Sequence, residues 1–164
     1  VRRWQFVCGK YAGLSLVLAL SVVLTGAALL VAVALKGDSP VGLLPAVVLA
    51  FVELELIAAF AVLFSSFTNP ILAAVGTVAT YVVGHLSWSF DLLEKRMAGD
   101  IGKAMCRGLH AFLPNLDRLN VKASAVHGLA LPPGYFAAAV VYGLSYALLI
   151  VILACLVFER REFV

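Results

Sequence analysis

Charged residues are scarce in this 164-residue chain, where Asp, Glu, Lys and Arg together make up only 13% of the sequence. A soluble domain typically has about 25% charged and about 45–50% apolar residues, whereas 63% of this chain is hydrophobic. This composition excludes an ordinary soluble enzyme, a disordered tail and a nucleic-acid-binding module, so no nucleic-acid partner is expected. The mean hydropathy of +1.06 indicates that most of the chain lies in a lipid bilayer.

Three long stretches carry no Asp, Glu, Lys or Arg, namely residues 11–35, 56–90 and 123–158. Each is longer than the roughly 20 residues that a helix needs to cross about 30 Å of hydrocarbon. Backbone groups in lipid must be hydrogen-bonded within their own segment, so spans of this length are helices, whereas barrel strands have about ten residues of alternating polarity. The sequence therefore predicts a polytopic, all-α integral membrane protein.

Cysteine is also scarce, and the three cysteines are scattered. Cys8, Cys106 and Cys155 fall in a flank, a loop and a span, so the sequence predicts no disulfide framework. Cys106 and His110 are four residues apart and would share a helix face, but two ligands do not make a metal site. The sequence has no phosphate-binding glycine loop and no Ser/His/Asp arrangement. We therefore expect no catalytic site, no metal and no cofactor.

The start of the chain lacks an initiator methionine, because residue 1 is Val1. We therefore expect further sequence upstream, so that the chain is part of a larger subunit. A secretory signal would have a short apolar core followed by a cleavage site. Residues 11–35 are too long for such a core, and we expect them to be retained as a span.

Four transmembrane helices are predicted within a single transmembrane domain that covers residues 1–164. Their expected bounds are about 11–35, 41–64, 70–90 and 135–158.

The connection between the third and fourth spans, residues 91–134, holds nearly half of the charged residues. Its first part, Asp91 to Phe112, has apolar residues at spacings of one, three or four, which predicts an amphipathic helix lying at the membrane interface. Its second part, Leu113 to Gly134, contains three prolines and is expected to be a structured loop. An even number of spans places both termini on one side. Lys and Arg occur at higher density near the termini than in the connecting segments, although the connecting segments hold more of them in total. The higher density favours cytoplasmic termini.

Two glutamates and one histidine interrupt the predicted spans: Glu53, Glu55 and His85. An ionised carboxylate in mid-membrane costs at least about 2.5–3.5 kcal/mol, and no Lys or Arg lies within a span to offset it. Glu53 and Glu55 are about 200° apart around a helix, so they face different directions. One interpretation is functional: the glutamates form a proton or cation site, or they line a polar path for a substrate. The other is structural: they are protonated or hydrogen-bonded and fix the packing of the helices. His85 lies near a membrane boundary, where an interfacial hydrogen bond is expected of it rather than a ligand role.

Small residues recur at intervals of four, which allows helices to approach closely in lipid. Three such rows are Gly9 and Gly13; Gly76, Thr80 and Gly84; and Ala139, Gly143 and Ala147.

Four stretches in this order resemble the permease subunit of an ATP-binding-cassette (ABC) exporter of the type-2 class. The stretches are Arg3–Tyr11 (RWQFVCGKY), Leu63–Pro70 (LFSSFTNP), Leu113–Lys122 (LPNLDRLNVK) and Phe158–Phe163 (FERREF). The first resembles a basic, aromatic stretch that precedes a span, and the second a tight turn between two spans. The third resembles an outer loop of one subgroup, and the fourth a basic cytoplasmic end. The chain departs from the pattern at Cys8, which replaces an aliphatic residue.

The resemblance implies a six-span permease of which this chain holds the last four spans, with cytoplasmic termini and residues 91–134 outside. It implies a bacterial cytoplasmic (inner) membrane location, a second permease subunit and a separate ABC ATPase subunit that uses the ATP. The residues that it assigns to ATPase coupling are Arg2, Arg3, Trp4, Phe6, Gly9 and Lys10. The residues that it assigns to an outer loop motif are Leu113, Pro114, Asn115, Leu116, Asn120 and Lys122.

Two other functions are compatible with the residues. One is a non-transporting membrane scaffold or assembly subunit in which Glu53 and Glu55 are structural polar contacts. The other is an ion-coupled secondary transporter that uses the same two glutamates. The substrate is not indicated, because apolar spans suit lipids, drugs and small hydrophobic molecules equally.

Overall fold

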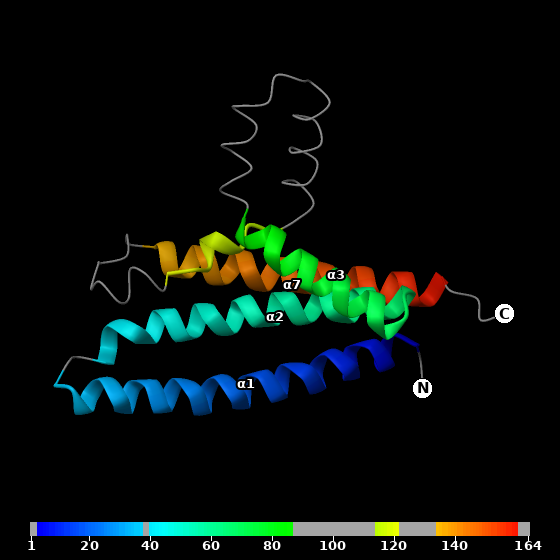
Figure 1. Cartoon of the computed structure of the whole chain (residues 1–164). Coiled ribbons are helices and arrows are strands. Elements are labelled where there is room, and N and C mark those ends of the chain that lie inside the picture. Colours follow the sequence, from blue (N-terminus) through cyan, green and yellow to red (C-terminus); the bar gives the residue numbers. More distant parts are fainter. Residues whose placement is uncertain (1–2, 38–39, 87–113, 122–133, 161–164) are drawn as a thin grey trace, which may run out of the picture.

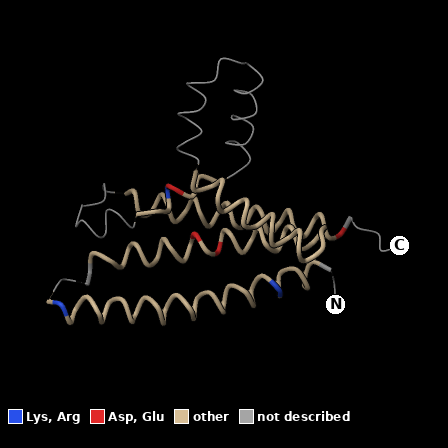
Figure 2. Tube along the Cα trace, viewed as in Figure 1, with Lys and Arg blue, Asp and Glu red and all other residues tan. Residues whose placement is uncertain are grey.

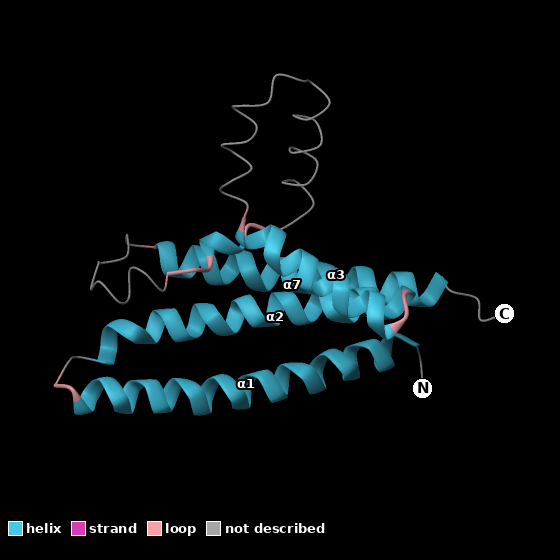
Figure 3. Ribbon diagram, viewed as in Figure 1, coloured by secondary structure: helices cyan, strands magenta, loops and turns pink. Residues whose placement is uncertain are grey.

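The structure is a computed structural model that describes residues 3–37, 40–86, 114–121 and 134–160. Each of these ranges contains helix (Figures 1 and 3). The α-helices are α1 (Arg3–Leu35), α2 (Leu44–Phe67), α3 (Pro70–His85) and α7 (Tyr135–Arg160), and the short 3-10 helices are η1 (Pro40–Leu43) and η2 (Leu116–Arg118). No strand occurs within these ranges.

Three of the helices are long and apolar enough to cross a membrane, as the sequence predicts. They are α1 with 33 residues, α2 with 24 and α7 with 26. The first of them begins earlier than expected, because the helix continues without a break from Arg3 through the predicted span to Leu35. At 1.5 Å per residue, α1 is about 50 Å long, which exceeds the thickness of the hydrocarbon layer by about 20 Å.

The predicted third span is shorter than expected in the described residues. Helix α3 has 16 residues and ends at His85 rather than near residues 88–90. The backbone N–H of Leu86 bonds to both Val82 O and Val83 O, so the last turn tightens and the helix stops. At about 24 Å, α3 alone falls short of about 30 Å of hydrocarbon. The predicted amphipathic helix Asp91–Phe112 lies outside the described residues.

Helix α2 occupies the centre of the arrangement and contacts α1, α3 and α7. Figure 1 shows α1 antiparallel to α2, α3 turning back along α2, and α7 running in the same direction as α2. Consequently α1 begins at the side where α7 ends. In their most apolar stretches, only 6% of the α1 residues are buried, against 56% of the α2 residues. Helix α1 is therefore peripheral within this chain.

The turn between α2 and α3 is fixed by local hydrogen bonds. The backbone N–H and the hydroxyl of Thr68 both donate to Phe64 O and close the end of α2. The side chain of Asn69 accepts a 2.9 Å hydrogen bond from Leu72 N and caps the start of α3. Pro70 occupies the first turn of α3, where a missing N–H costs nothing. Two residues are thus enough to reverse the chain.

Two of the three rows of small residues lie at close helix contacts. A Cβ added at Gly143 of α7 would collide with Cγ1 of Val52 on α2, and one at Gly76 of α3 would lie 3.2 Å from the ring of Phe64. Gly84 is similarly close to Leu116 of η2. The third row differs, because Gly9 and Gly13 have no heavy atom of another described part of the chain within 4 Å of such a Cβ.

We expect Gly143→Leu to lower the free energy of unfolding by about 1–3 kcal/mol, the usual cost of overpacking. The reason is that α2 and α7 must separate to admit any side chain at this position. A reversible unfolding titration in detergent micelles measures the change. Gly13→Leu is the matched control, and it should cause no loss because its site is open in this chain. Equal losses in both variants would contradict the packing role of Gly143.

Candidate functional site

The two glutamates of the sequence prediction lie midway along α2, distant from the charged ends of the helices (Figure 2). Both are almost fully buried, with exposed fractions of 4% for Glu53 and 3% for Glu55. They point to different neighbours, as their separation of about 200° around the helix requires. Glu53 faces α3, and Glu55 faces α1.

Glu53 is paired with His85, the third polar residue of the prediction. The distance between His85 Nε2 and Glu53 Oε1 is 3.2 Å. On its other edge, His85 Nδ1 lies 3.2 Å from the carbonyl oxygen of Tyr81. The imidazole also packs on the Tyr81 ring, with 4.5 Å between the ring centres. The contact joins α2 to α3 through two titratable side chains.

The hydrogen-bond partners of His85 determine how protons are distributed over this pair. A backbone carbonyl only accepts, so Nδ1 must carry a hydrogen and donate it to Tyr81 O. Nε2 then either donates to an ionised Glu53 or accepts a hydrogen from a protonated Glu53. In both cases one hydrogen atom joins Nε2 to Oε1, so the contact links the two side chains whichever of them carries it.

The pairing of Glu53 with His85 was not part of the sequence prediction, which treated His85 as an interfacial residue. A signal for it was present in the helical hairpin. Glu53 lies about 22 Å before Thr68 along α2, and His85 lies about 22 Å after Pro70 along α3. Residues equally distant from a tight turn reach the same depth, so Glu53 and His85 must lie level with each other.

Glu55 connects α2 to α1. Ser15 Oγ donates a 2.7 Å hydrogen bond to Glu55 Oε1, and Tyr11 OH lies 3.5 Å from the main-chain oxygen of the same glutamate. Next to Tyr11 in the sequence, Lys10 donates a 2.8 Å hydrogen bond from Nζ to Ser65 Oγ near the end of α2. Polar side chains therefore join the first half of α1 to α2.

The residues predicted to couple to an ATPase lie in the first two turns of α1. Trp4 and Phe6 are exposed, at 44% and 61%, although the Phe6 ring stacks on Phe158 of α7 with 6.0 Å between the centres. Gly9 lies on an open face of the helix, and Lys10 contacts α2. Arg3 begins the helix, and Arg2 lies outside the described residues.

The predicted outer loop motif packs against the start of α7 and the end of α3. Leu116 and Leu119 are completely or almost completely buried. Tyr142 OH accepts a 3.0 Å hydrogen bond from Asn115 N, and Tyr135 OH donates a 2.8 Å hydrogen bond to Arg118 O.

These contacts give backbone N–H and C=O groups of the irregular segment hydrogen-bond partners within the protein. Such partners are the condition for non-helical backbone at membrane depth. Within the motif, Pro114 is buried and Asn120 is exposed, whereas Leu113 and Lys122 lie outside the described residues.

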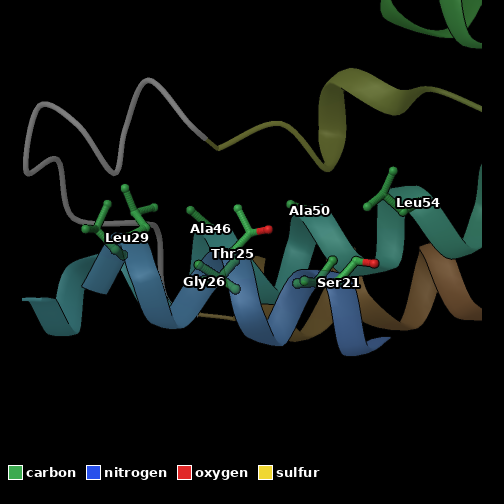
Figure 4. Close-up of a pocket in the computed structure, with 10 residues that line it drawn as sticks. Ser21, Thr25, Gly26, Leu29, Ala46, Ala50 and Leu54 are labelled. Atoms are coloured by element: carbon green, nitrogen blue, oxygen red, sulfur yellow. The ribbon is translucent and has the colours of Figure 1, made fainter. Parts of the chain in front are cut away.

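Two apolar grooves flank the line along which α1 rests on α2. The larger has a volume of about 420 Å³, and Figure 4 shows residues of both helices lining it, with Ser21 and Thr25 as its hydroxyl-bearing side chains. The smaller, of about 220 Å³, lies on the opposite side of Val22 and Val47. Gly26 lets Val47 approach closely between them. The contact between α1 and α2 is therefore narrow beyond the polar contacts of Tyr11 and Ser15.

Metal-binding chemistry is not indicated by the described side chains. Across residues 3–37, 40–86, 114–121 and 134–160, no group of three His, Cys, Asp or Glu side chains could hold an ion. The pair considered from the sequence, Cys106 and His110, lies outside these ranges.

Comparison of the chain with protein-family models, curated proteins and solved structures finds no match. The resemblance to ABC permeases therefore rests on the four sequence stretches and is carried forward below as a proposal.

The Glu53–His85 contact can be measured with a double-mutant cycle. We expect the destabilisation by Glu53→Ala and His85→Ala together to be smaller than the sum of the single effects, with a coupling energy of about 0.5–3 kcal/mol. Glu53→Gln should be tolerated, because its amide can donate to Nε2, whereas Glu53→Lys should prevent folding. The unfolding titration in micelles provides all of these free energies.

The control cycle combines Glu55→Ala with His85→Ala. Glu55 faces α1 and shares no contact with His85 in the described structure, so these two effects should add within about 0.5 kcal/mol. Equal coupling in both cycles would show that the measured energy does not come from the Glu53–His85 contact.

Proposed function

We propose that the chain is a permease subunit of an ATP-driven exporter of the type-2 ABC class. Two features support this proposal: the four resembling stretches follow one another in the expected order, and three helices are long and apolar enough to cross a membrane. In this proposal the spans are four, the predicted third one continuing from α3, and the membrane is the bacterial cytoplasmic membrane. A separate ABC ATPase subunit binds and hydrolyses the ATP.

The observation that carries the proposal is the continuity of α1. A single helix of 33 residues joins Trp4 and Phe6 to the whole predicted span. Because α1 is about 20 Å longer than the hydrocarbon is thick, its first turns can extend beyond the membrane core. A helix without a break transmits a displacement along its length. Force applied by an ATPase at Trp4 would therefore reach the membrane without passing through a flexible linker.

The first half of α1 is also the part that makes aromatic and polar side-chain contacts with α7 and α2. Phe6 stacks on Phe158, Lys10 donates to Ser65, and Ser15 donates to Glu55. A movement of the first turns of α1 would consequently be passed to α7 and to the centre of α2. The narrow, groove-flanked contact farther along α1 offers little resistance to such a movement.

The exposed side of α1 fits a chain that works with further helices. Most of α1 is unburied here, and Gly9 and Gly13 leave room for the close approach of another helix. We assign this side to a second permease subunit or to the two upstream spans that the resemblance implies.

The test of the coupling role uses Trp4→Ala and Phe6→Ala together. We expect an affinity-tagged chain purified from its own membrane to retain an ABC ATPase subunit, identified by mass spectrometry through its phosphate-binding loop. The double variant should insert normally but retain at least about 30-fold less ATPase. The reason is that loss of a buried aromatic anchor typically costs about 2 kcal/mol or more.

The matched control is Leu16→Ala, which shortens an exposed apolar side chain farther along the same helix and should leave ATPase retention unchanged. Normal retention in the Trp4/Phe6 variant would contradict the coupling role. If the tagged chain retains another membrane complex and no ATPase, the scaffold function is the better account.

The orientation is tested with one cysteine placed in the predicted outer loop motif and another placed near the end of α7. In a variant whose native cysteines are serine, Asn120→Cys should react with a membrane-impermeant thiol reagent added to intact cells. Glu159→Cys should react only after the cells are broken. Both residues are exposed, so the difference reports the side of the membrane, and the opposite pattern would invert the proposed topology.

A further inference from the structure

Two cysteines that are far apart in the sequence meet where α1 begins and α7 ends. The sulfur atoms of Cys8 and Cys155 are 3.9 Å apart, although 147 residues separate them. Both thiols are free and half-buried. The sequence led us to expect scattered cysteines, and the contact corrects that expectation for Cys8 and Cys155.

The contact between the thiols is part of a regular helix pairing. Helices α1 and α7 are antiparallel. Phe6, two residues before Cys8, stacks on Phe158, three residues after Cys155. Val7, which lies between Phe6 and Cys8, is buried at 3% exposure. The helices are therefore packed against each other directly beside the two sulfur atoms.

The remaining distance to a disulfide is small. A disulfide has its sulfur atoms about 2.05 Å apart, and the difference from 3.9 Å is less than a sulfur atom moves between two side-chain rotamers. Side-chain rotation can thus close the bond while the helices keep their positions.

We propose that Cys8 and Cys155 form an oxidation site at which a small disulfide compound converts the two thiols into an intramolecular disulfide. The thiolate of one cysteine attacks a sulfur of the compound, forms a mixed disulfide and releases one thiol. The second cysteine, as its thiolate, then attacks the mixed disulfide at the protein sulfur, forms the Cys8–Cys155 bond and releases the second thiol. The protein loses two electrons and two protons, and the compound gains them.

The consequence of the disulfide follows from where the two residues lie. The bond would fasten the first turns of α1 to the last turns of α7, next to Trp4 and Phe6. With cytoplasmic termini, the two thiols face a reducing compartment and stay reduced under ordinary conditions. This consequence rests on the proposed function: once the disulfide joins α1 to α7, α1 can no longer move relative to α7, and the permease is uncoupled from its ATPase.

The chemical test uses 4,4′-dithiodipyridine on the full chain in its own membrane, with Cys106→Ser as the background. The reagent is a small disulfide whose released thiopyridone is coloured. We expect two thiopyridones per chain and a protein whose mass has fallen by two hydrogen atoms, without a pyridylthio group. Two pyridylthio groups on one chain would overturn the proposal, because they would show that the thiols react independently.

Two variants in the same background serve as controls. Cys155→Ser leaves Cys8 without its partner and should give one thiopyridone and one retained pyridylthio group. Cys155→Ser combined with Leu156→Cys moves the thiol about 100° around α7, to a position that is 51% exposed. This variant should retain two pyridylthio groups, and efficient disulfide formation there would show that proximity at Cys155 is not specific.

The functional consequence has a separate measurement. ATPase retained with the tagged chain should hydrolyse ATP more slowly after oxidation, recover after addition of a dithiol, and be indifferent to the reagent in Cys155→Ser. A disulfide that forms without changing hydrolysis would overturn the uncoupling role. If no ATPase is retained at all, the proposed function fails, while the thiopyridone and mass measurements still decide whether the oxidation site exists.

Discussion

Two carboxylates buried in the middle of α2 determine how the other helices are arranged. A polar group removed from water needs a hydrogen-bonding partner, since the cost of leaving it without one is several kcal/mol. Glu53 and Glu55 point to opposite sides of one helix, so α3 supplies His85 on one side and α1 supplies Ser15 on the other. The remaining apolar surface of α2 packs against α7, where Gly143 lets the backbones approach. The central position of α2 follows from this division of its surface.

Much of the helical architecture could be predicted from local sequence. Long charge-free stretches specify helices that can cross a membrane, because lipid offers the backbone no alternative partners. The turn at Asn69 and Pro70 has the residues that end one helix and begin the next. The separation of Glu53 and Glu55 around α2 is a property of helical geometry and does not depend on any partner. The bounds of α1 and α3 were less predictable, because basic and aromatic residues flank the first, and the second ends at a tightened turn at Leu86 inside an uncharged stretch.

Contacts between segments that are distant in the sequence could not be predicted from local sequence patterns. His85 could have been assigned to Glu53 by counting residues from the turn, since a tight hairpin brings equal depths together. The meeting of Cys8 and Cys155 could not, because it depends on α1 and α7 being neighbours, and nothing between them in the sequence specifies that adjacency. The rows of small residues show the same limit. Gly76 and Gly143 lie against neighbouring helices. Gly9 and Gly13 have the same spacing but lie against no other described part of this chain.

The two glutamates place different demands on biosynthesis. A chain is made from its N-terminus, so Ser15 is already in place when Glu55 leaves the ribosome, and α1 and α2 can enter the bilayer together. Glu53 is made before His85, and α2 entering ahead of α3 would bear about 2.5–3.5 kcal/mol for a lone carboxylate. In the proposed four-span topology α3 also enters the bilayer, and the two-residue turn at Thr68 and Asn69 then makes a joint entry of α2 and α3 the less costly route. The insertion machinery would then have to hold α2 at its lateral exit until α3 has been synthesised.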